Sequence, residues 1–252
     1  MSEVKYIQLK NREIRSYARE RLLGNMFIPC LVTFFFFGMK QSFSLMMQLG
    51  ILGKDLFAFF FYIALFVVMN TAWGIFRYGI TRFFLIFITK KKTPVGEVFT
   101  GVRQSLEVIL GASLILTIIN LIFQLPYIVY AFFFAQNTMR DLLISLVMLS
   151  IGILISYLFE CYLSPMYFVI CDNPSMRLPF VVVTSLSLMN TKNFFKYIRL
   201  QISFLPLYIL GLISLGIGLL WVVPYAYTSY AYFYEDLCES YLQNNGVSQN
   251  IN

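Results

Sequence analysis

The chain has 252 residues, of which 59% are hydrophobic and 12% are charged, and its formal net charge is +7. About a quarter of the residues of a soluble globular domain are charged, so this composition excludes an ordinary soluble domain and predicts a polytopic membrane protein. The absence of histidine removes the commonest metal ligand and the usual general base, which argues against a metal site and against acid–base catalysis.

Residues 1–25 are predicted to form an interfacial helix on the cytoplasmic surface. Ile14, Ala18 and Leu22 recur at helical spacing, and Tyr17 lies beside them on the same side. Four arginines lie on or near the opposite side: Arg12, Arg15, Arg19 and Arg21. A nucleic-acid-binding arm is the weaker alternative, because the residues that follow enter the bilayer directly.

The first two membrane spans are predicted at 26–45 and from residue 56 onward. Lys40 lies at the far end of the first span, where its long side chain reaches the interface; a functional Lys40 is the less favoured alternative. The second run carries no charge as far as Phe76 and then passes a series of basic residues: Arg77, Arg82, and the lysines at 90–92. The triple lysine is typical of a cytoplasmic anchor.

The third and fourth spans are predicted at 108–139 and 142–171. The third run is longer than the bilayer is thick, so either Pro126 kinks the helix or the helix ends early, near Phe134. The apolar segment 178–189 is too short to cross a membrane and is interpreted as an interfacial or re-entrant helix.

The last apolar run, 200–234, has no charged side chain. A straight helix of this length would reach roughly 50 Å, whereas the hydrocarbon core is about 30 Å thick. Glycines cluster at its middle, so we predict a tight hairpin at 214–218 and six spans rather than five.

The distribution of basic residues orients the chain. Sixteen lysines and arginines lie before the first span and in the second and fourth loops, whereas three, Lys40, Lys54 and Arg140, lie on the other side. By the positive-inside rule the amino terminus is cytoplasmic, and anionic lipid headgroups are favoured over nucleic acid as partners of these residues. The tail from Glu235 has no Lys or Arg, so the rule cannot place it.

Together these patterns predict an all-α fold, a polytopic transmembrane helical bundle of about six spans with interfacial amphipathic helices. The whole chain, 1–252, is expected to be a single integral membrane domain. Its parts are the interfacial helix at 1–25, the membrane bundle at 26–238 and a polar tail at 239–252.

Ionisable groups inside a membrane span are functional candidates by default, because burying one costs roughly 2.5 to 3.5 kcal/mol on insertion scales. Glu160 is the clearest candidate, and we expect it to pair with Arg77 or Arg82 near the cytoplasmic boundary. Glu107 is expected at a similar depth. These four residues form a predicted intramembrane polar cluster, which is interpreted first as structural and second as part of a proton, ion or headgroup site.

The cysteines and the aromatic residues near the carboxyl terminus are interpreted as structural and not as catalytic or ligand-binding residues. The scattered cysteines Cys30, Cys161, Cys171 and Cys238 are interpreted as apolar packing residues. The tyrosines between 225 and 234, with Trp221 before them, are interpreted as a membrane-interface belt. There is no nucleophile elbow, phosphate loop or HExxH motif, so we expect no enzymatic activity, no cofactor and no metal.

The carboxyl-terminal third resembles a known family. The resemblance rests on Ser185, Leu188, Met189, Lys192, Phe195, Ser203, Phe204, the segment LGIGLLWVVPY, Ala231 and the segment FYEDL. On these residues the chain is similar to the domain-of-unknown-function family nine-seven-five, uncharacterised integral membrane proteins found mainly in Gram-positive bacteria. LLGN before residue 26 and VFTGV near residue 100 extend the similarity. Asn190 stands where the family has glycine, and Leu205 stands where an aromatic residue is common.

The resemblance implies a cytoplasmic-membrane protein of about six spans, distantly like the membrane domain attached to some glycerophosphodiester phosphodiesterases. It implies no established activity. We interpret the protein as non-enzymatic, binding lipid or a membrane protein partner in envelope homeostasis or protection. A small transporter or channel with Glu160 and Arg77 in its path is the alternative, and an enzyme acting on lipid ranks third.

Overall fold

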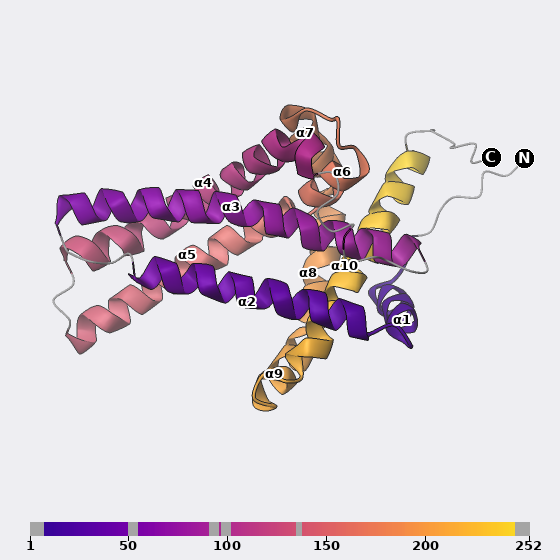
Figure 1. The fold of residues 1–252 in the computed structure, drawn as a ribbon, viewed down its shortest axis with the longest axis horizontal. Helices are drawn as coiled ribbons and strands as arrows, with labels where there is room; N and C mark the ends of the chain where they lie inside the picture. Colours follow the sequence, from indigo (N-terminus) through magenta and orange to yellow (C-terminus); the bar gives the residue numbers. More distant parts are fainter. Residues whose placement is uncertain (1–7, 50–54, 91–95, 97–101, 135–137, 245–252) are drawn as a thin grey trace, which may run out of the picture.

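The structure is a computed structural model that describes residues 8–49, 55–90, 96, 102–134 and 138–244. These residues form ten α-helices and no strand, which confirms the all-α prediction (Figure 1). The helices are α1 (Asn11–Leu22), α2 (Phe27–Leu49), α3 (Leu56–Thr89), α4 (Val102–Phe133), α5 (Met139–Tyr162), α6 (Met166–Asp172), α7 (Leu178–Leu188), α8 (Thr191–Ile202), α9 (Leu205–Ile213) and α10 (Leu219–Asn244).

The long helices α2 to α5 run along the long axis of the molecule in Figure 1. Among the described residues, four segments are long and apolar enough to cross a membrane: Leu56–Thr89, Ser105–Phe133, Met139–Asp172 and Thr191–Ile213. The bent pair formed by α1 and α2 raises the number to five. The predicted count of about six includes α10 as well, whose second half carries several acidic side chains.

The predicted fourth span, 142–171, is interrupted. Helix α5 ends at Tyr162, and α6 begins at Met166 after a short turn. Pro165 lies in this turn, and in a continuous helix its ring would clash with the carbonyl group of Cys161. The predicted span is nevertheless confirmed, because 142–171 lies within the candidate span Met139–Asp172, and Pro165 marks a break inside it. In the third span, α4 ends at Phe133, which agrees with the alternative that the helix ends early, near Phe134. The residue with non-helical backbone angles inside α4 is Ser105 and not Pro126.

The hairpin predicted at 214–218 is confirmed. Helix α9 ends at Ile213 and α10 begins at Leu219, with Leu215 and Gly216 at positive φ angles of 56° and 85°. The backbone N–H of Gly216 donates to the carbonyl of Gly211 at 3.1 Å, which closes the end of α9. In Figure 1 the hairpin crosses the long helices steeply instead of running beside them.

Helix α10 is a packing centre and does not form a lipid belt. Tyr234 is 4% exposed, and the ring of Tyr227 stacks on Phe84 with centroids 5.4 Å apart. Tyr197 packs between Tyr230 and Phe233. The belt interpretation was wrong because α10 contacts α1, α2, α3, α7, α8 and α9, leaving its tyrosines little surface for lipid. Trp221, before the tyrosines, is half exposed.

The predicted interfacial helix at 1–25 is α1, which begins at Asn11. Ile14, Ala18 and Leu22 are buried as the pattern predicts, but they are buried against protein, because α1 packs on α10 and α8. Tyr17 is 44% exposed and lies beside Tyr232. Residues 1–7 of the predicted helix lie outside the described residues, as do Lys54, Lys91 and Lys92 of the charge count.

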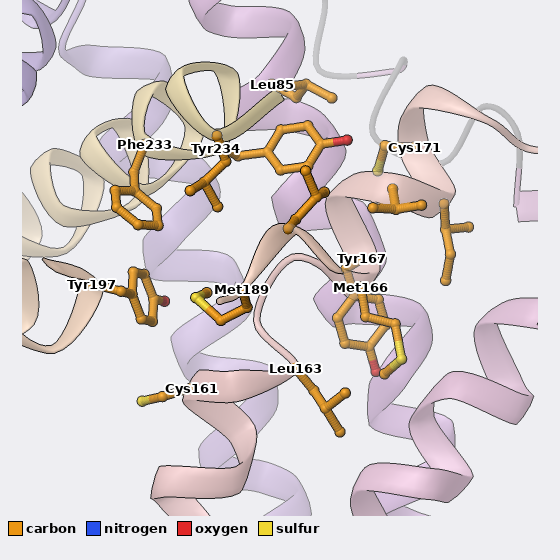
Figure 2. Packing of buried hydrophobic residues seen from close by; sticks show 14 of the residues in the cluster. Leu85, Cys161, Leu163, Met166, Tyr167, Cys171, Met189, Tyr197, Phe233 and Tyr234 are labelled. Atoms are coloured by element: carbon orange, nitrogen blue, oxygen red, sulfur yellow. The ribbon is translucent and has the colours of Figure 1, made fainter. Parts of the chain in front are cut away.

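The main core lies where the short helices meet α3, α4 and α10. Figure 2 shows Met166 and Tyr167 of α6 close to Leu163, and Tyr197 facing Phe233. Cys161 and Cys171 belong to this core, and all four cysteines are free, as expected of packing residues. The segment predicted at 178–189 is the short helix α7, whose Val181 and Leu188 reach the same core.

The two ends of the described chain lie together. The backbone N–H of Leu9 donates to Asp236 at 2.8 Å, and the side chain of Gln8 donates to Ser240 at 3.0 Å. Lys196 of α8 forms an ion pair with the same carboxylate at 2.5 Å. The first and last described segments of the chain therefore lie next to each other in the bundle.

The topology can be tested with reporter fusions. A reporter after Leu215 and a reporter after the last residue should report opposite sides of the membrane, because α10 lies between the two fusion points and is predicted to cross. Activity of alkaline phosphatase and fluorescence of green fluorescent protein fusions measure this. If both fusions report the same side, α10 does not cross and the chain has five spans.

Helix packing at Gly152 can be tested by adding one methyl group. A Cβ at Gly152 would lie 2.6 Å from the carbonyl oxygen of Phe123, so α4 and α5 would have to separate. We expect Gly152→Ala to lower the apparent Tm in detergent by about 4 to 10 °C, corresponding to about 2 kcal/mol or more of overpacking. Gly38→Ala is the control, because nothing lies within 4 Å of its Cβ position. An equal Tm for both variants would contradict the packing.

Candidate functional site

The predicted pair of Arg77 and Glu160 is present in the bundle. The guanidinium of Arg77 on α3 contacts Oε2 of Glu160 on α5 at 2.7 Å. Asn120 of α4 donates to Oε1 of the same carboxylate at 2.7 Å. Three helices thus supply one connected group, and both carboxylate oxygens have a donor. Such pairing offsets the cost of holding the charges in an apolar bundle.

Small residues allow the three helices to approach. Gly74 of α3 lies so close to Ser113 of α4 that an added Cβ would be 2.3 Å from the serine side chain. Gly152 plays the same role between α5 and α4. Ser113 also donates to the carbonyl of Asn70 at 3.0 Å, which ties α4 to α3. Close packing on small residues is typical of helices in membranes, where it brings backbones and polar groups within reach of each other.

A cavity of about 480 Å³ lies on one side of this pair. It is bordered by α2, α3, α4, α5, α9 and α10. The polar lining residues are Thr33, Lys40, Asn70, Arg77, Ser113, Thr117, Asn120, Gln124, Glu160, Tyr208 and Tyr227. We call this the central cavity.

A second cavity of about 230 Å³ shares Arg77 and Glu160 with the central cavity. Its other polar lining residues come mainly from α5, α6 and α8 and include Tyr157, Tyr167 and Gln201. The Tyr167 hydroxyl is buried within this lining. We call this the inner cavity. The ion pair therefore lies at the boundary between two polar spaces.

Two of the four predicted cluster residues lie elsewhere. Arg82 lies five residues further along α3, on a different side of the helix, and donates to the hydroxyl of Tyr78 at 3.2 Å. Glu107 is exposed at the start of α4. Position along the sequence predicted a similar depth for all four residues but could not tell which faces of the helices point inward.

Sequence reasoning missed Asn120, although a signal for it exists. Ser113, Thr117, Asn120 and Gln124 recur every three or four residues, so they form a polar stripe along one face of α4. In an otherwise apolar helix such a stripe indicates a face turned toward other polar groups. The sequence analysis predicted that the Lys40 side chain reaches the membrane interface. In the structure Lys40 lines the central cavity together with Arg77 and Glu160.

A different group of acidic residues lies past the apolar part of α10, which ends at Tyr234. Burial, together with the carboxylates of Glu239 and Asp172, raises the pKa of Glu235 to about 7. The surrounding pocket also contains Arg82 and Lys90. No cluster of three or more His, Cys, Asp or Glu side chains suited to a metal ion occurs in the part of the chain that the structure describes.

Comparison with protein families agrees with the resemblance seen in the sequence. A family model described as protein of unknown function (DUF975) matches residues 8–240. The chain belongs to this family. A search of curated proteins and a search of solved structures each returned no match. The match covers α1 through most of α10, so the ion pair and both cavities lie within the part of the chain that DUF975 describes.

Removing one partner of the pair should destabilise this DUF975 protein. Glu160→Gln leaves Arg77 without its counter-charge, and we expect the free energy of unfolding to fall by about 2 kcal/mol or more. The apparent Tm in detergent measures the effect. Exchanging the charges, as Arg77→Glu with Glu160→Arg, should recover part of the loss. Glu107→Gln is the control, because Glu107 is exposed, and an equal effect of that change would contradict the assignment.

The raised pKa of Glu235 predicts a pH dependence. A carboxyl group whose pKa is higher in the folded protein stabilises the fold below its ordinary pKa of 4.5, and this contribution is lost as the pH rises through about 7. The apparent Tm should therefore fall between about pH 5 and pH 7.5. Glu235→Gln should reduce that fall, whereas the exposed Glu13→Gln should not. Identical Tm profiles for both variants would contradict the prediction.

Proposed function

We propose that the protein is a non-enzymatic component of the bacterial cytoplasmic membrane whose central cavity binds the polar end of a lipid or of another amphiphile. The observation that carries this proposal is the position of the cavity. About 480 Å³ of space lined by charged, amide and hydroxyl groups lies inside helices that are apolar on their outer surface. Polar and charged groups in such a place are costly unless a ligand or a function uses them.

The outer surface supports placement in a membrane. Large apolar side chains are exposed along α2, α3 and α5, among them Phe34, Phe35, Phe57, Phe60, Leu142, Leu146 and Ile153. A soluble protein rarely exposes such a continuous apolar surface. The excess of basic residues at one end of the spans supports a cytoplasmic amino terminus.

The charges of the central cavity favour a headgroup over a neutral solute. Lys40 lines the cavity and adds a cation to the pair of Arg77 and Glu160. The site therefore offers two positive groups and one negative group within one space. A phosphate can bind the cations, and an ammonium group can bind the carboxylate, as in a phospholipid headgroup. By holding such a molecule the protein would act in envelope homeostasis or in protection against membrane-active compounds.

Lipid bound to the purified protein tests this proposal. Protein extracted in a mild detergent should retain lipid, which mass spectrometry identifies and quantifies. Lys40→Met with Asn120→Leu should reduce the retained amount by about fivefold or more, because the cavity loses a cation and an amide. Arg140→Met is the control, since this exposed cation lies outside the cavity. Equal lipid in the wild type and the cavity variant would overturn the proposal.

A transporter or channel is the second candidate, and one observation favours it. The ion pair borders both the central and the inner cavity, as a gate in a permeation path would. Opening such a path requires the pair to separate, which makes the pair itself the point to test.

Thiol accessibility separates the two functions. Cys161 lines the inner cavity, so a variant that keeps Cys161 and replaces the other three cysteines by serine carries a reporter there. A gate predicts that a charged, membrane-impermeant maleimide labels Thr33→Cys in the central cavity and reaches Cys161 only after Arg77→Ala. Labelling of Cys161 that does not depend on Arg77 would exclude the pair as a gate.

A further inference from the structure

A third space, open to the surface, lies between α1, the end of α8 and α10. It has a volume of about 620 Å³. Its lining residues are Asn11, Arg12, Arg15, Ser16, Arg19, Arg199, Ser203 and Tyr225. None of these residues borders the central or the inner cavity. We call this space the arginine cavity.

The sequence places the arginines on one face for a simple geometric reason. Arg12, Arg15 and Arg19 are three and four residues apart, so they follow one another along one side of α1. The apolar residues of α1, Ile14 and Ala18, are fully buried against the rest of the protein and fix the rotation of the helix. The arginine row is thereby held toward the end of α8, where Arg199 lies.

One arginine is already oriented. The guanidinium of Arg15 lies over the rings of Phe204 and Tyr225, 5.2 and 5.9 Å from their centroids. Its Nε donates to the Tyr225 hydroxyl at 3.4 Å, and that hydroxyl donates to the Arg15 carbonyl at 3.1 Å. A stacked guanidinium keeps N–H groups at its edge available for an anion.

The charge of this cavity is unbalanced. Four arginines line it, and no carboxylate is among its described lining residues. Like charges that line the same space repel one another, and an anion bound among them would relieve that repulsion. Arginines bind phosphate oxygens with two parallel hydrogen bonds, which makes a phosphate the anion that this geometry fits best.

The surroundings indicate where the phosphate comes from. Ile202 and Leu205, immediately beside the Ser203 that lines the cavity, are 61% and 56% exposed. Helix α9 continues this apolar surface with Ile209 and Leu210, also exposed. An anion in the arginine cavity therefore lies next to a surface suited to acyl chains.

We propose that the arginine cavity is a binding site for the phosphate of an anionic phospholipid, with the acyl chains lying along α9. The site is at the end of the bundle where Leu9 contacts Asp236, because α1 forms one of its walls. The site shares no residue with the central cavity, so its test is independent of the test of the function proposed above. Bound lipid would join α1 to α8 by bridging Arg12 and Arg199.

Native mass spectrometry of the full chain in detergent tests the site by titration with phosphatidylglycerol and with phosphatidylcholine. The wild type should bind phosphatidylglycerol more tightly. Arg12→Gln with Arg199→Gln should weaken that binding by about 30-fold, given about 1 kcal/mol for each basic residue near a membrane surface. Both side chains are exposed and take no part in the core, so the variant is expected to fold.

The matched control is Lys192→Gln with Arg177→Gln, which removes the same charge from exposed residues outside the cavity. This control should bind phosphatidylglycerol as the wild type does. Glycerol 1-phosphate and inorganic phosphate, each tested alone, should bind far more weakly. Equal loss in both double variants would show a general charge effect and overturn the proposal. Equal affinity for glycerol 1-phosphate and phosphatidylglycerol would show a site for soluble phosphates and overturn it too.

Discussion

The ion pair between Arg77 and Glu160 depends on how closely three helices approach. A charge in an apolar bundle is tolerated only when its partners are already in position, and here the partners come from α3, α4 and α5. Gly74 and Gly152 permit this approach, because a single methyl group at either position would press against the neighbouring helix. The two glycines and the ion pair therefore form one constraint: loosening the packing would leave charges without partners. The central and the inner cavity both border this ion pair.

Much of the architecture follows from composition and periodicity. The long apolar runs, the short helix α7, the amphipathic α1 and the hairpin at 214–218 each have a local cause in the sequence, such as run length, helical spacing or clustered glycines. The break before α6 also has a local cause, Pro165, but the apolar run around it obscured the signal. Local signals of this kind are strong because the bilayer leaves backbone groups few alternatives to a helix.

The site was harder to predict because it depends on which helix faces meet. The charge of Glu160 and the need for a partner pointed to Arg77, and the structure joins them. Depth in the membrane alone could not exclude Arg82 or Glu107 as partners of Glu160. Residues at the same depth can lie on different faces of their helices, and only some of those faces point toward Glu160. The tyrosines of α10 show the same limit: an aromatic cluster at the end of a span is typical of a lipid interface, yet here it fills the interior. Only tertiary packing distinguishes the two outcomes.

The contacts between the two ends of the chain affect how the protein can be made. Gln8 and Leu9 bind Ser240 and Asp236, and α1 buries its apolar side chains against α10, although 232 and 227 residues separate the bonded positions in the sequence. During synthesis α1 must therefore wait with its apolar face unpaired, and the membrane surface is the natural place to hold it. A chain that lacks α10 would leave that face without its main packing partner. The packing of α10 on α1 thus joins two segments that are far apart in the sequence.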